Sequence, residues 1–393
     1  MKVSDKDNVI DILNQLDSEN YVFGFRWFLD LCLNTALDRT EKLKVLSLCD
    51  DLNASVEADK APSSAFISEV RALTDLCIER MPSNMQSHSA IADASEISKS
   101  YRSGQFYLKP INISVLPGEL IGVVGENGNG KTTLLRMIAC DLSLDEGSID
   151  YQVTGNIDSS LYDLKRNIAY IPQRIPRWYG KLKNNLHFAA SSRGIYGFEN
   201  EYLVKIMITR LGLHKYQNLF WTQISSGYRT RFELARILLL QPKLLILDEP
   251  LANLDINAQQ TFLQDLRNIA KSETNPLAIL FSSQQLHEVE KVANHIVFLR
   301  NGASIYNSTV DGKEVLEAYT ETEVETKASR ENILQLLQEI DSVNVKFQGG
   351  IYIIRCDNSV TSMQILKQLI EGGIEISYFR DLTRSTKKFF NQV

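Results

Sequence analysis

The sequence predicts an α/β protein with a parallel sheet covered by helices, preceded by an all-helical extension and followed by a small α/β domain. Two observations predict the middle part. Short apolar runs such as "LIGVV", "LLIL" and "LAIL" alternate with amphipathic helical segments, and the first of these runs leads into a glycine-rich turn. Strands that alternate with helices are typical of a parallel sheet. The changes of pattern along the chain predict three domains, at residues 1–90, 91–315 and 316–393.

Composition limits the class of protein and its partners. The 393 residues are 44% hydrophobic and 23% charged, with a formal net charge of -6, as in ordinary globular proteins. The acidic balance argues against a general binder of phosphate backbones, so we expect no nucleic-acid partner. The five cysteines form no C-x-x-C pair, and no apolar run approaches the roughly 20 residues that span a bilayer. We therefore expect a reduced, cytoplasmic protein.

The first 90 residues carry helical patterns. Apolar residues recur at helical spacing in "AFISEVRALTDLCIERM", at Phe66, Val70, Leu73, Cys77 and Met81. The aromatic-rich stretch "YVFGFRWFLD" has two interpretations. Either it docks a partner, or Phe23, Trp27 and Leu31 pack in the core of the extension or against the next domain. The second interpretation is the simpler one. The loop "MPSNMQSHSA" is the predicted boundary.

A phosphate-binding loop follows the run "LIGVV". "GENGNGKTT" fits the pattern G-x-x-x-x-G-K-[ST], in which glycines let successive backbone N–H groups converge on phosphate oxygens. Lys131 adds a positive charge at the β- and γ-phosphates, and the Thr132 hydroxyl binds Mg²⁺. The helix that begins near Lys131 directs its positive dipole end at the same point. The predicted nucleotide-binding residues of this loop are Gly125, Asn127, Gly128, Gly130, Lys131, Thr132 and Thr133.

Two carboxylates follow the apolar run "LLIL". Asp248 and Glu249 stand where a buried parallel strand ends, at the edge where α/β proteins bind ligands. We expect Asp248 to hold the metal ion and Glu249 to polarise the water that attacks the phosphate. Taken alone, the pair fits an acidic turn before Pro250 equally well. The phosphate loop earlier in the chain favours the catalytic interpretation.

The residues after 316 predict the small α/β domain. "ENILQLLQEI" and "TSMQILKQLI" carry helical patterns, and "IEISYF" is a predicted strand. "VNVKFQGGIYIIRC" predicts a hairpin of two alternating strands joined at Gly349 and Gly350.

A serine-containing segment precedes the two carboxylates, in "ISSGYRTRFELARILLLQPKLLILDEPLANLD". Ser225 and Ser226 precede a predicted helix, so their hydroxyls and the free N–H groups of its first turn converge on an anion. Here the sequence resembles the ATP-binding cassette (ABC) ATPases, whose signature LSGGQ corresponds to Ile224–Tyr228, with Ser226 and Tyr228 in place of glycine and glutamine. The resemblance covers about residues 91–310. It implies a P-loop NTPase cassette with a helical signature subdomain.

Other motifs of the ABC family occur in the family order. "SKSY" puts Tyr101 where an aromatic ring stacks on adenine. "YIPQ" puts Gln173 at the Q-loop, so that Thr132, Gln173 and Asp248 are the implied metal-binding residues. "LANLD" puts Asp255 at the D-loop.

The resemblance implies an ATPase that binds ATP and Mg²⁺ and is the motor subunit of a transporter. Two cassettes would close head to tail around two ATP molecules, as a homodimer or a heterodimer, with Ser225, Ser226 and Gly227 facing the nucleotide of the other subunit. Separate transmembrane permease subunits would move the cargo, which places the protein on the inner face of the cell membrane. The C-terminal domain resembles the tail of ATPases that drive ABC-2 type exporters. The alternative is any compact regulatory or dimerising domain.

The stretch "FSSQQLHEVE" departs from the family pattern S-S-H-x-L-x-E, in which the histidine reaches the γ-phosphate. Gln284 stands at the histidine position, and His287, one helical turn further on, stands at a variable position. The amide of Gln284 donates a neutral hydrogen bond but carries no proton or charge as imidazole does. We expect Glu249, Gln284 and Gln173 to be the catalytic residues, with hydrolysis dependent on Glu249.

Two other functions stay open on the sequence. The first is an ATP-dependent switch that hydrolyses slowly because of Gln284. The second is a non-transport ABC ATPase that acts on ribosomes or DNA. In the family, the translation-factor branch carries two cassettes and the DNA-repair branch inserts a long coiled coil. This chain has one phosphate loop and no coiled-coil pattern.

Overall fold

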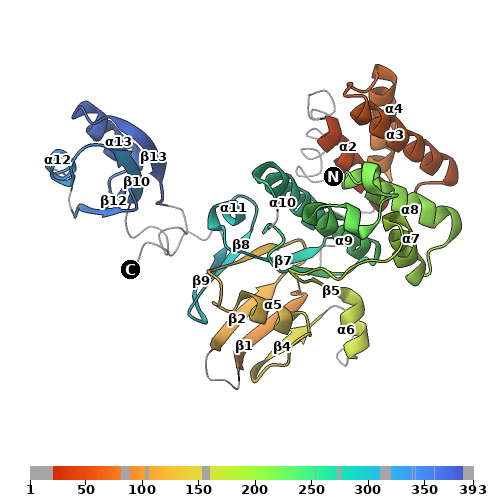
Figure 1. Ribbon diagram of the computed structural model, residues 1–393, viewed down its shortest axis with the longest axis horizontal. Helices are drawn as coiled ribbons and strands as arrows, with labels where there is room; N and C mark the ends of the chain where they lie inside the picture. The colour runs from red at the N-terminus through yellow and green to blue at the C-terminus, as the bar shows by residue number, and fades with distance from the viewer. Residues whose placement is uncertain are drawn as a thin grey trace. The chain divides into compact units, whose positions relative to one another are not determined.

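The computed structural model describes residues 21–80, 89–101, 106–152, 160–252, 254–271, 276–309, 320–338, 340, 342–357 and 359–383 (Figure 1). The chain divides into two compact units. The first comprises residues 1–284 and 297–307, and the second comprises residues 285–296 and 308–393. The domain boundaries near residues 90 and 315 stay predictions, and the second lies in residues 310–319, outside the described residues. No helix in the described ranges has the length and apolarity to cross a membrane.

Three helices form the described part of the N-terminal extension: α2 (Tyr21–Asn34), α3 (Arg39–Glu57) and α4 (Ser64–Glu79). Asp38 begins α3 with a capping box to Glu41, and Ser63 caps α4, because side-chain oxygens satisfy N–H groups of the first turn. Of the apolar residues predicted to form one face of α4, four are buried: Phe66, Val70, Leu73 and Cys77. Met81 lies outside the described residues.

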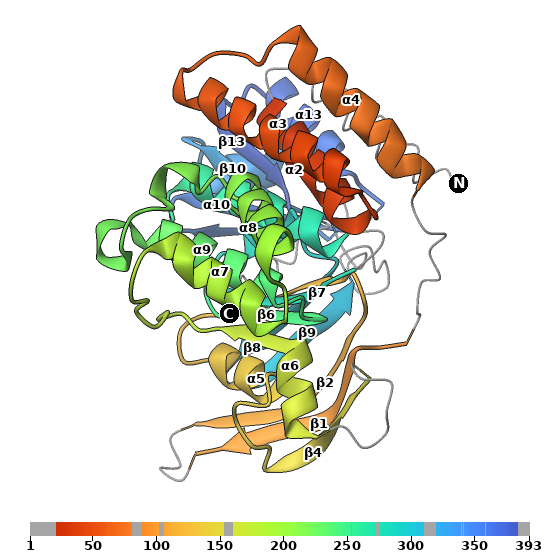
Figure 2. The same ribbon diagram turned by 90° about the vertical axis from the view of Figure 1, so that its right-hand side faces the viewer.

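The predicted packing of α2 is confirmed in part: Trp27 and Leu31 pack against the core of the extension, but other residues of the helix form its centre. Phe25, Phe28 and Leu29 are fully buried, whereas Phe23, Trp27 and Leu31 are half-buried. Helix α2 is apolar on most of its surface, so its periodicity does not identify which side is covered. The neighbouring helices decide it: the core of the extension includes Tyr202 and Ile206 of α8 (Gly197–Arg210), and Figures 1 and 2 show the extension beside that helix.

A sheet of six strands forms the centre of the first unit, in the order β5-β6-β7-β3-β8-β9. Its strands are β3 (Leu120–Val124), β5 (Ile168–Ile171), β6 (Leu244–Leu247), β7 (Ala278–Ser283), β8 (His295–Arg300) and β9 (Ala303–Thr309). The pairings β5–β6, β6–β7 and β7–β3 are parallel, with Leu247 opposite Phe281 and Val123 opposite Ser282. The carboxyl ends of these strands therefore lie at one edge, as the predicted parallel sheet requires.

Helices and a second sheet pack around the central sheet of the first unit. Helices α5 (Lys131–Ile138) and α10 (Ile256–Ala270) pack on the central strands. The sequence interpretation missed an antiparallel sheet of three strands in the order β2-β1-β4. These strands are β1 (Ala92–Ser100), β2 (Tyr107–Val115) and β4 (Glu146–Tyr151). Their many polar residues and the irregular register of β1 weaken the alternation that identifies a strand.

Helix α6 (Leu161–Asn167) contacts β5. The predicted helical signature subdomain consists of α7 (Leu182–Ser192), α8 and α9 (Ser226–Leu239), with short 3₁₀ turns at His214–Tyr216 and Trp221–Gln223. Helices α7, α8 and α9 contact one another. Trp178 stacks on Trp221 with ring centroids 5.0 Å apart, and its Nε1 donates to Glu233 of α9 at 3.0 Å.

The second unit contains α11 (Leu286–Glu290) and an antiparallel sheet in the order β11-β12-β10-β13. Its strands and remaining helices are β10 (Thr320–Thr326), α12 (Arg330–Leu336), β11 (Asn344–Gln348), β12 (Ile351–Cys356), α13 (Ser362–Glu371) and β13 (Ile376–Asp381). The predicted hairpin is confirmed, with both turn glycines at positive φ. Strand β10 was missed because its sequence, "TETEVET", is polar, although its first five residues are buried.

The burial of α2 leads to a stability prediction. Phe28→Ala should lower the free energy of unfolding by about 3–5 kcal/mol, because Phe28 is fully buried and the substitution leaves a cavity. The matched control is Phe188→Ala, since Phe188 is 76% exposed, and it should change stability by less than about 0.5 kcal/mol. Urea unfolding measures both, and equal losses in the two variants would contradict the burial of Phe28.

Candidate active site

The phosphate loop connects β3 to α5. Gly125, Asn127 and Gly128 lie in the turn between them, and Gly130 is the N-cap of α5 with φ 99°. A Cβ atom on Gly130 would lie 2.6 Å from a Leu108 side-chain carbon, so the position excludes a side chain. The first N–H groups of α5 are thus available to an anion, in agreement with the predicted phosphate site.

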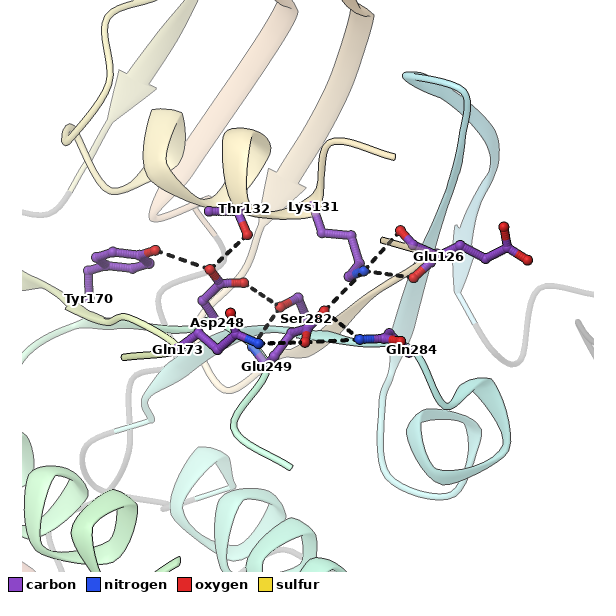
Figure 3. Close-up of polar contacts among 10 residues, drawn as sticks. Glu126, Lys131, Thr132, Tyr170, Gln173, Asp248, Glu249, Ser282 and Gln284 are labelled. Atoms are coloured by element: carbon purple, nitrogen blue, oxygen red, sulfur yellow. Dashed lines mark hydrogen bonds and ion pairs between the residues drawn. The ribbon is translucent and has the colours of Figure 1, made fainter. Parts of the chain in front are cut away.

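Lys131 and Thr132 begin α5 and connect the loop to the strand ends. Lys131 is 4% exposed, and its Nζ donates to the carbonyl oxygens of Gly125 at 2.7 Å and Glu126 at 3.1 Å. The same ammonium lies 3.2 Å from Oε1 of Glu249. The Thr132 hydroxyl donates to Oδ2 of Asp248 at 2.8 Å. Figure 3 shows these side chains converging on the end of β6.

Ser282 joins the two acidic residues and was missed as a site residue. Its hydroxyl donates to Oδ1 of Asp248 at 2.8 Å and accepts the backbone N–H of Glu249 at 2.8 Å (Figure 3). It is fully buried at the end of β7, which lies beside β6 in the sheet. The signal in the sequence was a hydroxyl at the end of an apolar strand, and the neighbour that it bonds becomes visible only with the strand order.

Tyr170 of β5 was also missed. Its hydroxyl donates to Oδ2 of Asp248 at 3.4 Å. Burial raises the pKa of the Tyr170 phenol, and the negative charge of Asp248 raises it further, so the phenol stays protonated and keeps its donor. Asp248 therefore accepts hydrogen bonds from hydroxyl groups on three elements: α5, β5 and β7.

The Glu249 carboxylate is the meeting point of the predicted catalytic residues. Gln173 donates its amide N–H to Oε2 at 3.0 Å, and Gln284 donates to both oxygens, at 3.1 and 3.0 Å (Figure 3). Glu249 has φ 47°, a left-handed backbone that non-glycine residues seldom adopt. The bond from its N–H to Ser282 helps to hold that conformation. Residues far apart in sequence thus form one network around a single carboxylate.

The signature residues form a second group outside this network. Ser225 is the exposed N-cap of α9, its side chain makes no capping bond, and Ser226 is the first residue of the helix. At Gly227 a Cβ atom would lie 2.5 Å from a Leu254 methyl carbon, so the start of α9 approaches the loop before α10 closely. Asp255 caps α10 by accepting the Ala258 N–H at 2.9 Å.

Tyr101 lies beside the start of α5. It follows β1, is 40% exposed, and shares a hydrogen bond of 3.2 Å with the Thr133 hydroxyl. An exposed ring at this place fits the predicted contact with adenine. Two other residues considered in the sequence have contacts of their own. Tyr228, a departure from the signature, packs on Tyr216 with centroids 3.9 Å apart, and His287, at the variable position, contacts Glu288 at 3.2 Å.

The predicted metal-binding residues supply only oxygen atoms: the hydroxyl of Thr132, the amide of Gln173 and the carboxylate of Asp248. Within the described ranges, no group of three or more His, Cys, Asp and Glu side chains could hold a metal ion. Mg²⁺ is bound in many nucleotide sites through few protein oxygens, with the remaining positions taken by phosphate and water. The donor set therefore fits Mg²⁺, and the hydrogen bond from Thr132 to Asp248 puts two of its members side by side.

Comparison with known proteins gives the family. A family model described as "ABC transporter" matches residues 108–252. A phosphonates import ATP-binding protein, PhnC 2 of Oceanobacillus iheyensis, is 30% identical over 232 residues, which cover 55% of this chain and 89% of that protein. The chain belongs to the ABC transporter ATP-binding proteins. An uncharacterised member, YxlF of Bacillus subtilis, is 28% identical to this ABC ATPase over 299 residues, or 75% of this chain and 96% of YxlF.

Solved structures agree with this ABC fold. The cbiO1 subunit from Clostridium perfringens, part of the complex cbiONQ, has a TM-score of 0.51 at 24% identity and covers 58% of this chain and 93% of its own. The cassette MJ0796, solved as a dimer with ADP and phosphate, has a TM-score of 0.50 at 20% identity, over 56% of this chain and 99% of its own. At these identities the likeness shows the fold.

The chain is thus an ABC-type ATPase that binds ATP. The family match includes Lys131, Gln173, the signature residues and both carboxylates, but it ends at residue 252. Gln284 lies beyond that match. Its assignment therefore depends on its position at the end of β7 and on its bonds to Glu249.

The bridging position of Ser282 leads to a prediction. Ser282→Ala should lower kcat for ATP hydrolysis about 10-fold, because it leaves a buried N–H of Glu249 and an oxygen of Asp248 with one partner fewer. Steady-state phosphate release measures it. Ser148→Ala removes an exposed hydroxyl from β4 and should retain kcat within about 2-fold. Equal rates in the two variants would rule out a special role for Ser282.

Proposed function

We propose that this ABC ATPase is the motor subunit of a transporter, in which two ATPase chains close head to tail around two ATP molecules and drive separate membrane-spanning permease subunits. The observation that carries the proposal is the division of the site into two groups. Lys131, Glu249 and Gln284 form one network, while Ser225 presents an uncapped, exposed hydroxyl at the start of α9. A second chain can supply the second group to the first.

ATP binding uses the phosphate loop and Lys131, whose ammonium exchanges its contact with Glu249 for a contact with phosphate. The ammonium that pairs with Glu249 lies at the start of α5, where the N–H groups of the loop receive the phosphates. A γ-phosphate offers this ammonium a stronger set of negative oxygens, so the lysine turns to the nucleotide and frees the Glu249 carboxylate. Thr132, Gln173 and Asp248 would hold Mg²⁺, which supplies positive charge to the β- and γ-phosphates.

Hydrolysis then needs a base, and Glu249 is in the position to be that base. A water attacks the γ-phosphorus, the bond to the β-phosphate oxygen breaks, and the Glu249 carboxylate takes a proton from the water, which gives ADP and phosphate. Gln173 and Gln284 orient the carboxylate through their amide N–H groups. Ser282 fixes the backbone of the base relative to Asp248.

The relatives support the transport role and its location. PhnC 2 is named for phosphonate import, and cbiO1 belongs to a transporter complex. MJ0796 was solved as a dimer with the products ADP and phosphate. By analogy, this chain pairs with an identical or related ATPase and works at the cytoplasmic face of a membrane that holds its permease.

A slow ATP-dependent switch is the second candidate, and Gln284 favours it. In the family pattern an imidazole at this position reaches the γ-phosphate. In this chain the amide N–H of Gln284 points to the Glu249 carboxylate instead. An amide carries no positive charge to a phosphate in the transition state, so hydrolysis would be slow. The dimer would then stay closed around ATP for longer.

The assignment of the base is tested by Glu249→Gln. This variant should lose at least about 100-fold in kcat, because an amide cannot accept the proton, while ATP affinity changes by less than about 3-fold. Gel filtration with ATP should show a stable dimer of the variant. Glu201→Gln, on the exposed side of α8, is the matched control and should behave as the wild type. An unchanged rate in Glu249→Gln would defeat the assignment.

The switch hypothesis is tested by Gln284→His. The imidazole should raise kcat, by up to about 100-fold, because one well-placed donor to a developing charge is worth about that much in rate. His287→Gln is the control, and its rate should equal that of the wild type, since His287 contacts Glu288. A Gln284→His rate equal to the wild type would leave the switch hypothesis without support.

A further inference from the structure

Helix α2 of the N-terminal extension is connected to α10 by a buried ion pair. The Nη1 of Arg26 donates to the two carboxylate oxygens of Asp265, at 3.0 and 3.2 Å. Arg26 is 9% exposed and Asp265 is 4% exposed. Two charges withdrawn from water are strongly attracted, and a guanidinium fixes the direction of the contact as well as its distance.

The same helix is connected to α8 one turn further along. Asp30 accepts two hydrogen bonds from Arg210, one from Nε to Oδ1 and one from Nη2 to Oδ2 at 2.7 Å. Burial raises the pKa of Asp30, and the charge of Arg210 opposes that effect. The pair is bidentate, so it fixes the orientation of α8 relative to α2.

Arg231 adds the signature helix α9 to this group. Its Nη1 donates to the Leu211 carbonyl oxygen at 3.3 Å, at the end of α8, and burial lowers its pKa. At Gly212 the site of a Cβ atom lies 3.3 Å from Nη2 of Arg26 and 3.9 Å from Nη1 of Arg231. The guanidinium groups of α2 and α9 therefore meet at one glycine. We define the buried charge cluster as Arg26, Asp30, Arg210, Arg231 and Asp265.

The cluster lies on the helices that present the predicted partner-facing residues. Helix α9 begins at Ser226 and α10 is capped by Asp255. Their starts also touch, at Gly227 and Leu254. A change in the angle between α9 and α10 at the cluster therefore displaces the signature residues relative to the loop before α10.

Apolar packing alone leaves space at this junction. A pocket of about 120 Å³ that is partly open to solvent lies between α2, α8, α9 and α10, lined by side chains that include Asp30, Leu203, Arg210, Leu238 and Ile269. An incompletely filled apolar interface permits more than one helix orientation, because no close fit selects one. The directional charge pairs beside this pocket supply the constraint on helix orientation that packing does not.

We propose that Arg26 and Asp30 are positioning residues, through which the N-terminal helix α2 sets the orientation of α9 relative to α10 and so the place where Ser225 to Gly227 meet the ATP of the second chain. This inference rests on the proposed function and extends it to the role of the extension. Helix α2 is thus part of the ATPase machinery, acting through α9, and does not touch the nucleotide.

The test separates orientation from stability. Arg26→Met leaves Asp265 without its partner, whereas the double variant Arg26→Met/Asp265→Leu replaces the pair by apolar side chains, which often restores stability but not direction. Arg80→Met makes the same chemical change at an ion pair with Glu41, within the extension, and is the matched control. Measurements on the full chain are kcat, the Kd for ATP without Mg²⁺ by calorimetry, and the urea unfolding midpoint.

We expect kcat to fall about 10-fold in Arg26→Met and in the double variant, with the Kd for ATP within about 2-fold of the wild type in both. The double variant should recover the unfolding midpoint without recovering kcat. Arg80→Met should retain the wild-type kcat. Recovery of kcat together with stability in the double variant would reduce the cluster to a structural role and overturn the proposal, as would an unchanged kcat in Arg26→Met.

A second measurement does not depend on hydrolysis. Amide hydrogen exchange in the peptide that covers Ile224–Arg229 should become faster in Arg26→Met and in the double variant than in Arg80→Met, since α9 loses its fixed orientation. Equal exchange in all three variants would overturn the inference. A wild-type protein without ATPase activity would count against the proposed function, whereas the exchange result would still decide the role of Arg26.

Discussion

The parallel register of β5, β6, β7 and β3 is the constraint on which the site depends. It brings the ends of four strands to one edge, and each end contributes polar groups there: Tyr170, Asp248 with Glu249, Ser282 with Gln284, and the loop before Lys131. Hydrogen bonds between these groups then take the place of water at the edge. The chemistry is local, but it exists only because segments more than 100 residues apart are paired as neighbours, as in the bond between Thr132 and Asp248.

The Glu249 carboxylate contacts several of the polar groups at this edge. Glu249 faces an ammonium and two amides, on a backbone held in the left-handed region. The second group of residues lies at the starts of α9 and α10, and the buried charge cluster connects those helices to α2. The predicted partner-facing residues and the extension are therefore connected through the same pair of helices.

Sequence patterns predicted the features that depend on neighbouring residues in the chain. The glycines and Lys131 predicted the phosphate loop, and the carboxylates at the end of an apolar strand indicated Asp248 and Glu249 as site residues. The structure was needed wherever the role or the burial of a residue depends on its neighbour in space. Ser282 gains its role from β6, which the sequence does not place beside it. The buried side of α2 depends on α8, and the burial of Glu321 in β10 depends on its pairing with Arg355 of β12. Sequence patterns predict periodicity, and partners in space determine which side is buried.

The stack of Trp178 on Trp221 has a practical consequence. Trp178 follows Gln173 by five residues, Trp221 precedes the signature by three, and the pair packs at the junction with α9, where Trp178 contacts Phe232 and Glu233. The chain has three tryptophans in all, and the third, Trp27, is in α2. The intrinsic ultraviolet emission of the protein is therefore weighted toward this junction. Its intensity and wavelength therefore report on the packing of these two rings against α9, without an attached dye.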